Sequence, residues 1–297
     1  MARKIETTFL NEFKTGILNP LLSYVQNDDT LDMELRGNSV IIYYRGGKIL
    51  TINESCEMVE LDKQYLSGKI IEKPSLATFE KYLPQAKHIV DYFILNSKHN
   101  HLGEKEIQQR IVQENNYSQN SLDTDYFIID MEYQDIGRAD IVALRWDSTS
   151  SARKLPKDYL PTITIFEVKQ GFKSISGKSG MKSHLTDFIN FVANKAKIDA
   201  FKQDMIAIFE QKKELKLIRN IDKYKRIDQV SENIEFVFLL ANYKPASKKL
   251  EQELEKIDDD CKFIYANTMG YGLYAKNIID KQRFIKLFLC KSPSIAE

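Results

Sequence analysis

Residues 162–170 of this chain read Thr-Ile-Thr-Ile-Phe-Glu-Val-Lys-Gln, and they decide how it is expected to fold. The first five residues place apolar side chains on both faces, which is typical of a central strand buried on both sides. Because side chains alternate along a strand, Glu167 and Lys169 share one face, and Phe166 and Val168 share the other. Charges at the end of a buried strand are costly unless they are paired or bind a metal ion. The stretch therefore predicts a strand that ends in chemically useful groups.

Apolar runs on either side of this strand predict an α/β domain over residues 99–297. Helices alternating with buried strands favour a mixed sheet that is flanked by helices on both faces. Strands are predicted at residues 126–132, 139–145, 162–169, 235–240 and 262–266. Helices are predicted at 103–115, from about 182 to 219, and at 247–257.

Residues 1–98 are predicted to form an accessory region of a helix, a small antiparallel sheet and a second helix. Apolar residues recur at helical spacing over 4–26, where Pro20 is expected to kink or end the helix. Residues 33–53 predict a β-hairpin, in which Gly46 and Gly47 supply the positive φ angles of a tight turn. Residues 75–98 predict another helix, bent or broken at Pro84.

Three further motifs complete a resemblance to a known family. Gly137-Arg138-Ala139-Asp140-Ile141 opens the strand before Glu167-Val168-Lys169, a glutamate-bearing helix lies upstream, and Ser183-His184-Leu185-Thr186-Asp187-Phe188 begins a helix downstream. In this order the pieces resemble the PD-(D/E)xK nuclease superfamily, whose fold is restriction-endonuclease-like. The resemblance covers about residues 100–280, roughly one domain. The proline that names the family is replaced by Ala139.

The resemblance implies a metal-dependent phosphodiester hydrolase. Asp140 and Glu167 are then the metal ligands, together with the backbone carbonyl of Val168, and hard oxygen ligands favour Mg²⁺ or Mn²⁺. Lys169 would orient or help deprotonate the attacking water, or stabilise developing negative charge. The alternative for these residues is a structural Glu–Lys pair beside an unrelated aspartate.

The upstream acid has two candidates on one predicted helix. Glu104 shares a helix face with Ile107 and Ile111, whereas Glu106 lies about 160° away. If the isoleucines face the sheet, Glu104 is the catalytic candidate. The alternative is an ordinary first-turn glutamate that the helix dipole favours.

Substrate contacts are predicted around the end of the same strand. Gln170 could orient the substrate or merely close the strand. His184 could contact a phosphate, hydrogen-bond a metal-bound water, or pack as a helix-start residue. The glycine, serine and lysine of residues 171–182 suggest a mobile loop that touches phosphates. Its lysines are Lys173, Lys178 and Lys182.

The charge distribution supports a phosphate-binding partner. Residues 169–226 carry 14 Lys and Arg against 6 Asp and Glu, whereas residues 1–130 carry 14 against 19. A basic block that starts at Lys169 is expected of a protein that binds a phosphate backbone, and a solvated helix surface is the alternative. DNA is expected more than RNA, because DNA is the commoner substrate of the family that the chain resembles.

Other features limit where and how the protein acts. No apolar run of about 18 residues predicts a membrane span. The three cysteines, Cys56, Cys261 and Cys290, fit neither a disulfide framework nor a zinc site and suit the cytoplasm.

A homodimer is expected if both DNA strands are cut. The alternative function is a catalytically weak nuclease-fold protein that binds nucleic acid or recruits a partner.

Overall fold

A computed structural model describes residues 3–66, 68–96, 103–134, 139–171, 174–177, 180–242, 247–257, 260–266 and 270–289. Contacts divide the chain into two compact units. Unit 1 comprises Met1–Leu122 and Phe201–Asp228, and unit 2 comprises Asp123–Ala200 and Gln229–Glu297. The predicted α/β class is confirmed, because helices accompany one antiparallel sheet and one mixed sheet.

The elements that begin before residue 123 are α1 Thr7–Lys14, α2 Asn19–Gln26, β1 Leu31–Leu35, β2 Ser39–Tyr44, β3 Gly47–Asn53, β4 Met58–Glu60, α3 Lys63–Leu66, α4 Phe79–Asn96, α5 Glu104–Val112, a π-helical turn Gln113–Tyr117 and a 3₁₀ turn Ser121–Asp123. Those that follow are β5 Tyr126–Tyr133, β6 Ala139–Arg145, a 3₁₀ turn Ala152–Lys154, β7 Thr162–Gln170, α6 Met181–Val192, α7 Lys195–Glu214, β8 Glu235–Ala241, α8 Lys248–Leu254, β9 Lys262–Ala266, a 3₁₀ turn Ala275–Asn277, β10 Ile279–Asp280 and α9 Lys281–Phe288.

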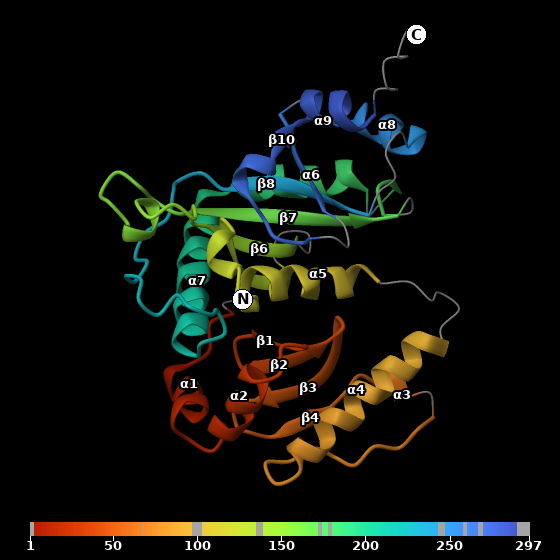
Figure 1. The fold of residues 1–297 in the computed structure, drawn as a ribbon, viewed down its shortest axis with the longest axis vertical. Coiled ribbons are helices and arrows are strands. Elements are labelled where there is room, and N and C mark those ends of the chain that lie inside the picture. The colour runs from red at the N-terminus through yellow and green to blue at the C-terminus, as the bar shows by residue number, and fades with distance from the viewer. Residues whose placement is uncertain are drawn as a thin grey trace. The chain divides into compact units, whose positions relative to one another are not determined.

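Unit 1 is built on a four-stranded antiparallel meander, β1-β2-β3-β4 (Figure 1). The predicted hairpin is present as β2 and β3, but its turn differs in detail. Arg45 and Gly46 hold the two positive φ angles, 51° and 73°, and Gly47 already begins β3. Positive φ at both central positions is what a two-residue hairpin turn requires. Gly46 is also fixed by packing, since a Cβ there would lie 2.4 Å from the backbone carbon of Lys105.

Two of the predicted helices divide. Residues 4–26 form α1 and α2. Pro20 neither kinks nor terminates a helix but lies in the first turn of α2. This position suits proline, because the first helical turn needs no N–H donor to the preceding turn. The stretch from 182 to 219 forms α6 and α7, whereas α4 continues through Pro84.

Side chains of α7 and of the segment after it hold together parts of unit 1 that are distant in sequence. Gln211 exchanges hydrogen bonds with the backbone of Ile5, and the Asp204 carboxylate accepts from the backbone N–H of Arg3. Arg219 donates to the carbonyl oxygens of Tyr117 and Gln26. The division by contacts assigns residues 99–122 and 201–228 to unit 1, whereas the sequence predicts them in the second domain.

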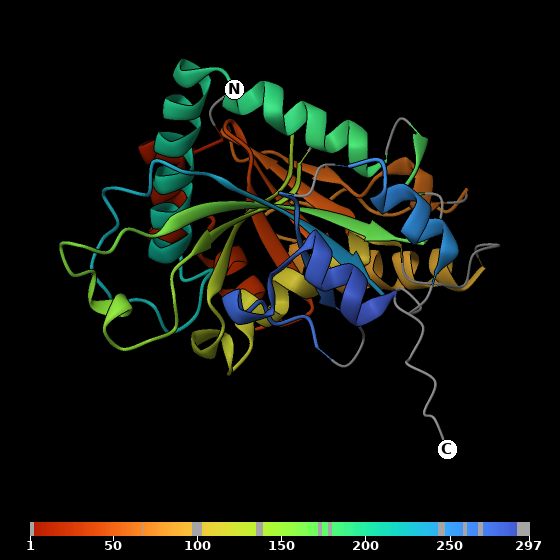
Figure 2. The same ribbon diagram turned by 90° about the horizontal axis from the view of Figure 1, so that it is seen from above.

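Unit 2 is built on a six-stranded mixed sheet in the order β10-β9-β8-β7-β6-β5. β5, β6 and β7 form an antiparallel meander, whereas β7, β8 and β9 run parallel. Figure 2 shows the twist of these strands from above. On one face of the sheet, α6, α8 and α9 pack on β8 and β9 (Figure 1). The shared core includes Met181, Leu254 and Phe284 from the helices and Phe238 and Phe263 from the strands. β7 is thus an internal strand, as its apolar sequence predicts.

Candidate active site

The carboxyl end of β7 lies beside the start of β6, and together they form the centre of the candidate site. Ile141 pairs with Phe166 across the two antiparallel strands, so Asp140 reaches the end of β7. The backbone N–H of Val168 donates a hydrogen bond of 2.8 Å to Asp140 Oδ2. Counted over the whole residue, Asp140 is 9% exposed, and Glu167 and Lys169 are each 2% exposed. Residues that are separate motifs in the sequence are therefore neighbours in the fold.

One carboxylate oxygen of Glu167 is contacted by two side-chain nitrogens. Lys169 Nζ lies 2.6 Å from Glu167 Oε1, and His184 Nε2 lies 3.1 Å from the same atom. Lys169 reaches it because residues two apart on a strand share a face. His184 reaches it from the first turns of α6. A buried carboxylate next to a buried ammonium avoids the cost of an isolated charge.

The strand register places a further acid on the same face. Val142 pairs with Ile165 on β7 and with Asp130 on β5. Directly paired side chains share a face, so Asp130 lies on the face that carries Asp140, Glu167 and Lys169. Asp130 is fully buried. No motif in the sequence identifies Asp130, although a carboxylate inside the apolar run of residues 126–131 is a usable signal.

The segment after β7 is held to the core where the structure describes it. Ile175 is fully buried and belongs to the core cluster beneath α6, α8 and α9. Ser174 Oγ donates to the carbonyl oxygens of Gln170 and Gly171. The backbone N–H of Met181, which starts α6, donates to the carbonyl of Ile175. These described parts therefore differ from the predicted mobile loop, because an apolar anchor and side-chain bonds tie them down.

The predicted substrate-binding residues have different outcomes. Gln170 is half-buried and ends β7, and Lys182 is exposed in the first turn of α6. His184 contacts Glu167 through the ring nitrogen described above. Lys173 and Lys178 lie outside the described residues, as do Gly137 and Arg138 of the upstream motif.

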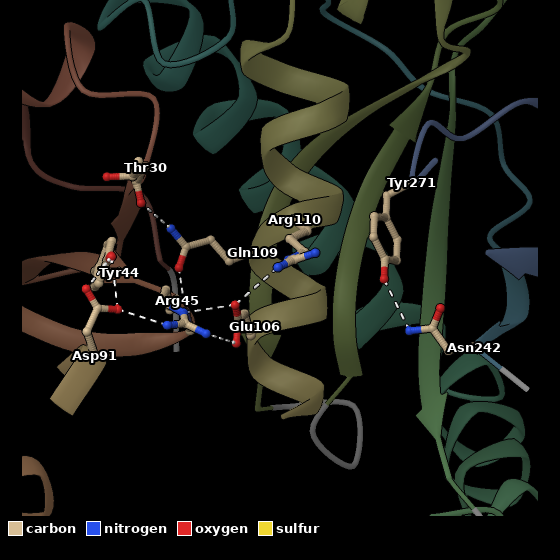
Figure 3. Close-up of polar contacts among 10 residues, drawn as sticks. Thr30, Tyr44, Arg45, Asp91, Glu106, Gln109, Arg110, Asn242 and Tyr271 are labelled. Atoms are coloured by element: carbon tan, nitrogen blue, oxygen red, sulfur yellow. Dashed lines mark hydrogen bonds and ion pairs between the residues drawn. The ribbon is translucent and has the colours of Figure 1, made fainter. Parts of the chain in front are cut away.

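The two upstream acids lie on α5, which belongs to unit 1, whereas β6 and β7 belong to unit 2. Glu104 is half-buried, and Glu106, predicted to face away from the isoleucines, is 6% exposed. Glu106 accepts hydrogen bonds from Arg45 and Arg110, as Figure 3 shows. α5 is buried on more than one face, so helical spacing alone could not identify the buried acid. The catalytic role of Glu104 stays a prediction.

Arg45 extends this network to the hairpin and α4 of unit 1 (Figure 3). Its guanidinium also bonds Asp91, which accepts from the hydroxyl of Tyr44. Burial and the hydrogen bond to Asp91 raise the pKa of Tyr44 to about 12. Because the donors and acceptors satisfy one another, this cluster acts as a structural connection within unit 1.

The basic block of residues 169–226 is divided between the two units. In unit 1, Lys212 contacts Glu34, Lys213 donates to the carbonyls of Tyr224 and Lys225, and Arg219 donates to the carbonyls noted above. These three cations hold the chain together. In unit 2, Lys182, Lys195 and Lys197 are exposed and could reach phosphates.

In the part of the chain that the structure describes, no three His, Cys, Asp or Glu side chains are grouped to hold a metal ion. The carboxylates of Asp140 and Glu167 and the main-chain carbonyl of Val168 are oxygen donors at the strand end. In a strand, the N–H and C=O of one residue point to the same edge. Since the Val168 N–H faces Asp140, its carbonyl also faces that side.

Comparisons with protein-family models, with curated proteins and with solved structures find no match. Among the helices that the structure describes, none is long and apolar enough to span a membrane.

Proposed function

We propose that this protein is a metal-dependent nuclease that hydrolyses phosphodiester bonds, in DNA more than in RNA. The observation that carries the proposal is the convergence of Asp140, Glu167 and Lys169 at one strand end, all buried. This is the arrangement expected of a PD-(D/E)xK site on a restriction-endonuclease-like sheet. The order β5-β6-β7-β8-β9, antiparallel and then parallel, supports that finer fold assignment.

The donor set fits Mg²⁺ or Mn²⁺ rather than zinc, since it consists of hard oxygens. Asp140, Glu167 and the carbonyl of Val168 would hold the ion, with water completing its shell, because Mg²⁺ usually keeps several waters. A divalent cation bound there supplies charge neutralisation at the scissile phosphate.

The protein's own residues perform the remaining steps. Lys169 lies beside the ligand carboxylate, so its ammonium orients the attacking water and stabilises negative charge that develops on the phosphate. Burial strengthens this electrostatic effect, because the local dielectric is lower than in water. Lys182 and the other exposed lysines of unit 2 bind the phosphate backbone. Gln170, at the end of β7, is proposed as a substrate contact.

A nuclease assay on the wild type, Lys169→Ala and Lys276→Ala tests the proposal. Plasmid, linear duplex, single-stranded DNA and RNA are incubated at low salt with Mg²⁺ or Mn²⁺, and with EDTA as the control. Lys276 is an exposed lysine outside the site, so its variant controls for lost positive charge. We expect metal-dependent cleavage that falls about 100- to 10,000-fold in Lys169→Ala alone.

Two other results would change the assignment. Equal cleavage by wild type and Lys169→Ala would mean that the site is wrong or that a contaminant is active. Absence of cleavage, with salt-sensitive nucleic-acid binding in all three proteins, would favour the non-catalytic binding protein. We also propose that the protein acts in the cytoplasm and as a homodimer. Gel filtration with and without DNA tests the dimer.

A further inference from the structure

The ring of His184, for which the sequence predicts a substrate contact, lies against the Glu167 carboxylate. The Nε2–Oε1 distance is 3.1 Å, and the side chains are 15% and 3% exposed. We infer that His184 is a positioning residue, which holds Glu167 in the orientation that a divalent cation needs. The inference rests on the proposed function, because it assigns His184 a task within that site.

The start of α6 is fixed firmly enough for this role. Ile175 and Met181 anchor it in the core of unit 2, and the N–H of Gly180 donates to Gly177. Gly180 packs so closely that a Cβ would lie 2.8 Å from backbone atoms of Ser176. His184 follows one turn later, so its ring is carried by an anchored helix rather than by a loose loop.

The geometry at Glu167 explains what His184 adds to Lys169. The ammonium of Lys169 is a compact charge on a flexible stem, so it restricts the rotation of the carboxylate only weakly. A second donor on Oε1, coming from a different element, restricts that rotation. Partners that orient ligating side chains typically change metal affinity or activity by about 10- to 100-fold when they are removed.

Calorimetric titration of Mn²⁺ into the protein, without nucleic acid, measures this role directly. Wild type, His184→Ala, His184→Gln and Thr186→Ala are compared. Thr186 is exposed on the same helix and serves as the control. We expect Mn²⁺ to bind about 10- to 100-fold more weakly to His184→Ala. His184→Gln, which keeps an N–H donor, is expected to recover most of the affinity.

A substrate-contact role for His184 predicts different measurements and would overturn the inference. Mn²⁺ affinity would then be unchanged in His184→Ala. The affinity for DNA would fall instead, and the dependence of log K on log salt would become shallower by about one phosphate contact.

A double-mutant cycle tests the contact even if the protein is not a nuclease. Urea unfolding of His184→Ala, Glu167→Met and the double variant is followed by fluorescence of Trp146, which is buried in unit 2. Coupled residues should change the unfolding equilibrium non-additively, by about threefold or more. Additive effects would exclude the positioning role. If wild type binds no Mn²⁺ while the cycle shows coupling, the proposed function fails, and with it the cation-positioning role, but the contact is established.

Discussion

Each unit of the protein buries a carboxylate–ammonium pair, and the two pairs are nearly equal in distance and exposure. In unit 1, Lys212 Nζ lies 2.7 Å from Glu34 Oε1, with side chains 1% and 0% exposed. In unit 2, Lys169 Nζ lies 2.6 Å from Glu167 Oε1, with both side chains 3% exposed. Burial and pairing alone therefore cannot distinguish a reactive site from a structural one.

The surroundings of Glu34 indicate a structural role. Its partner Lys212 is 178 positions away in sequence, so the pair connects α7 to β1. Arg36 lies 3.3 Å from its other oxygen. Burial raises the pKa of Glu34, against the opposing charges of Lys212 and Arg36 and together with the charge of Asp32. Nothing in this sequence pattern resembles a catalytic motif.

The surroundings of Glu167 differ in kind. Its lysine is only two residues away on the same strand, so that pair holds no distant segments together. Asp140 lies at the end of the neighbouring strand, and His184 approaches from α6. The comparison shows that the convergence of several polar groups at a strand end, rather than burial of a pair, supports the catalytic proposal.

The largest expected effect on stability comes from Lys212→Ala. Removing this lysine leaves Glu34 buried with its strongest partner lost, so we expect the free energy of unfolding to fall by about 3–5 kcal/mol. Urea unfolding followed by circular dichroism measures the change. A loss below about 1 kcal/mol would contradict the structural role of the pair.

A double replacement gives this first prediction its control. Glu34→Leu with Lys212→Met removes both charges and keeps similar volumes. We expect this variant to recover most of the lost stability, because a buried ion pair is often no more stabilising than apolar residues of similar size.

A smaller effect on stability is expected for Lys169→Ala. The Glu167–Lys169 pair lies within one strand and joins no distant segments, so we expect the free energy of unfolding to fall by only about 1–2 kcal/mol, whereas cleavage falls by orders of magnitude. Trp146 fluorescence during urea unfolding measures the stability of unit 2. A loss as large as that of Lys212→Ala, with cleavage retained, would make Glu167–Lys169 a second structural pair.

The smallest effect belongs to Glu235, whose pair with Lys262 is half-exposed and provides a surface reference. Burial raises the pKa of Glu235, but the hydrogen bond and charge of Lys262 and the charge of Arg145 outweigh it and hold the pKa below the ordinary 4.5. A lowered folded pKa contributes stability above pH 4.5, which is lost as the pH falls through the folded value.

Glu235→Gln should therefore be less stable than wild type by roughly 0.5–1 kcal/mol at pH 7, and the difference should vanish well below pH 4.5. Urea unfolding across this pH range measures it, with the exposed Glu251→Gln as control. A difference that grows as the pH falls would mean that the Lys262 contact does not stabilise the carboxylate.

Local patterns in the sequence were sufficient to predict the strands around the site. The apolar runs at β6, β7 and β8 identify buried strands because the alternation of side chains depends only on the backbone. The same alternation places Glu167 and Lys169 on one face. The sequence also predicts the hairpin of β2 and β3, although its turn uses Arg45 and Gly46 rather than two glycines.

The sequence by itself thus determined the α/β class, the central strand and the three residues on which the proposed chemistry depends. Only the tertiary structure decided which partners other residues take: His184 with Glu167, Lys212 with Glu34, Glu106 with Arg45, and Ile175 with the core. The physical reason is the separation in sequence between the residues that interact. Strand periodicity arises from neighbouring residues, whereas these contacts depend on which helix packs on which strand, and no local pattern encodes that choice.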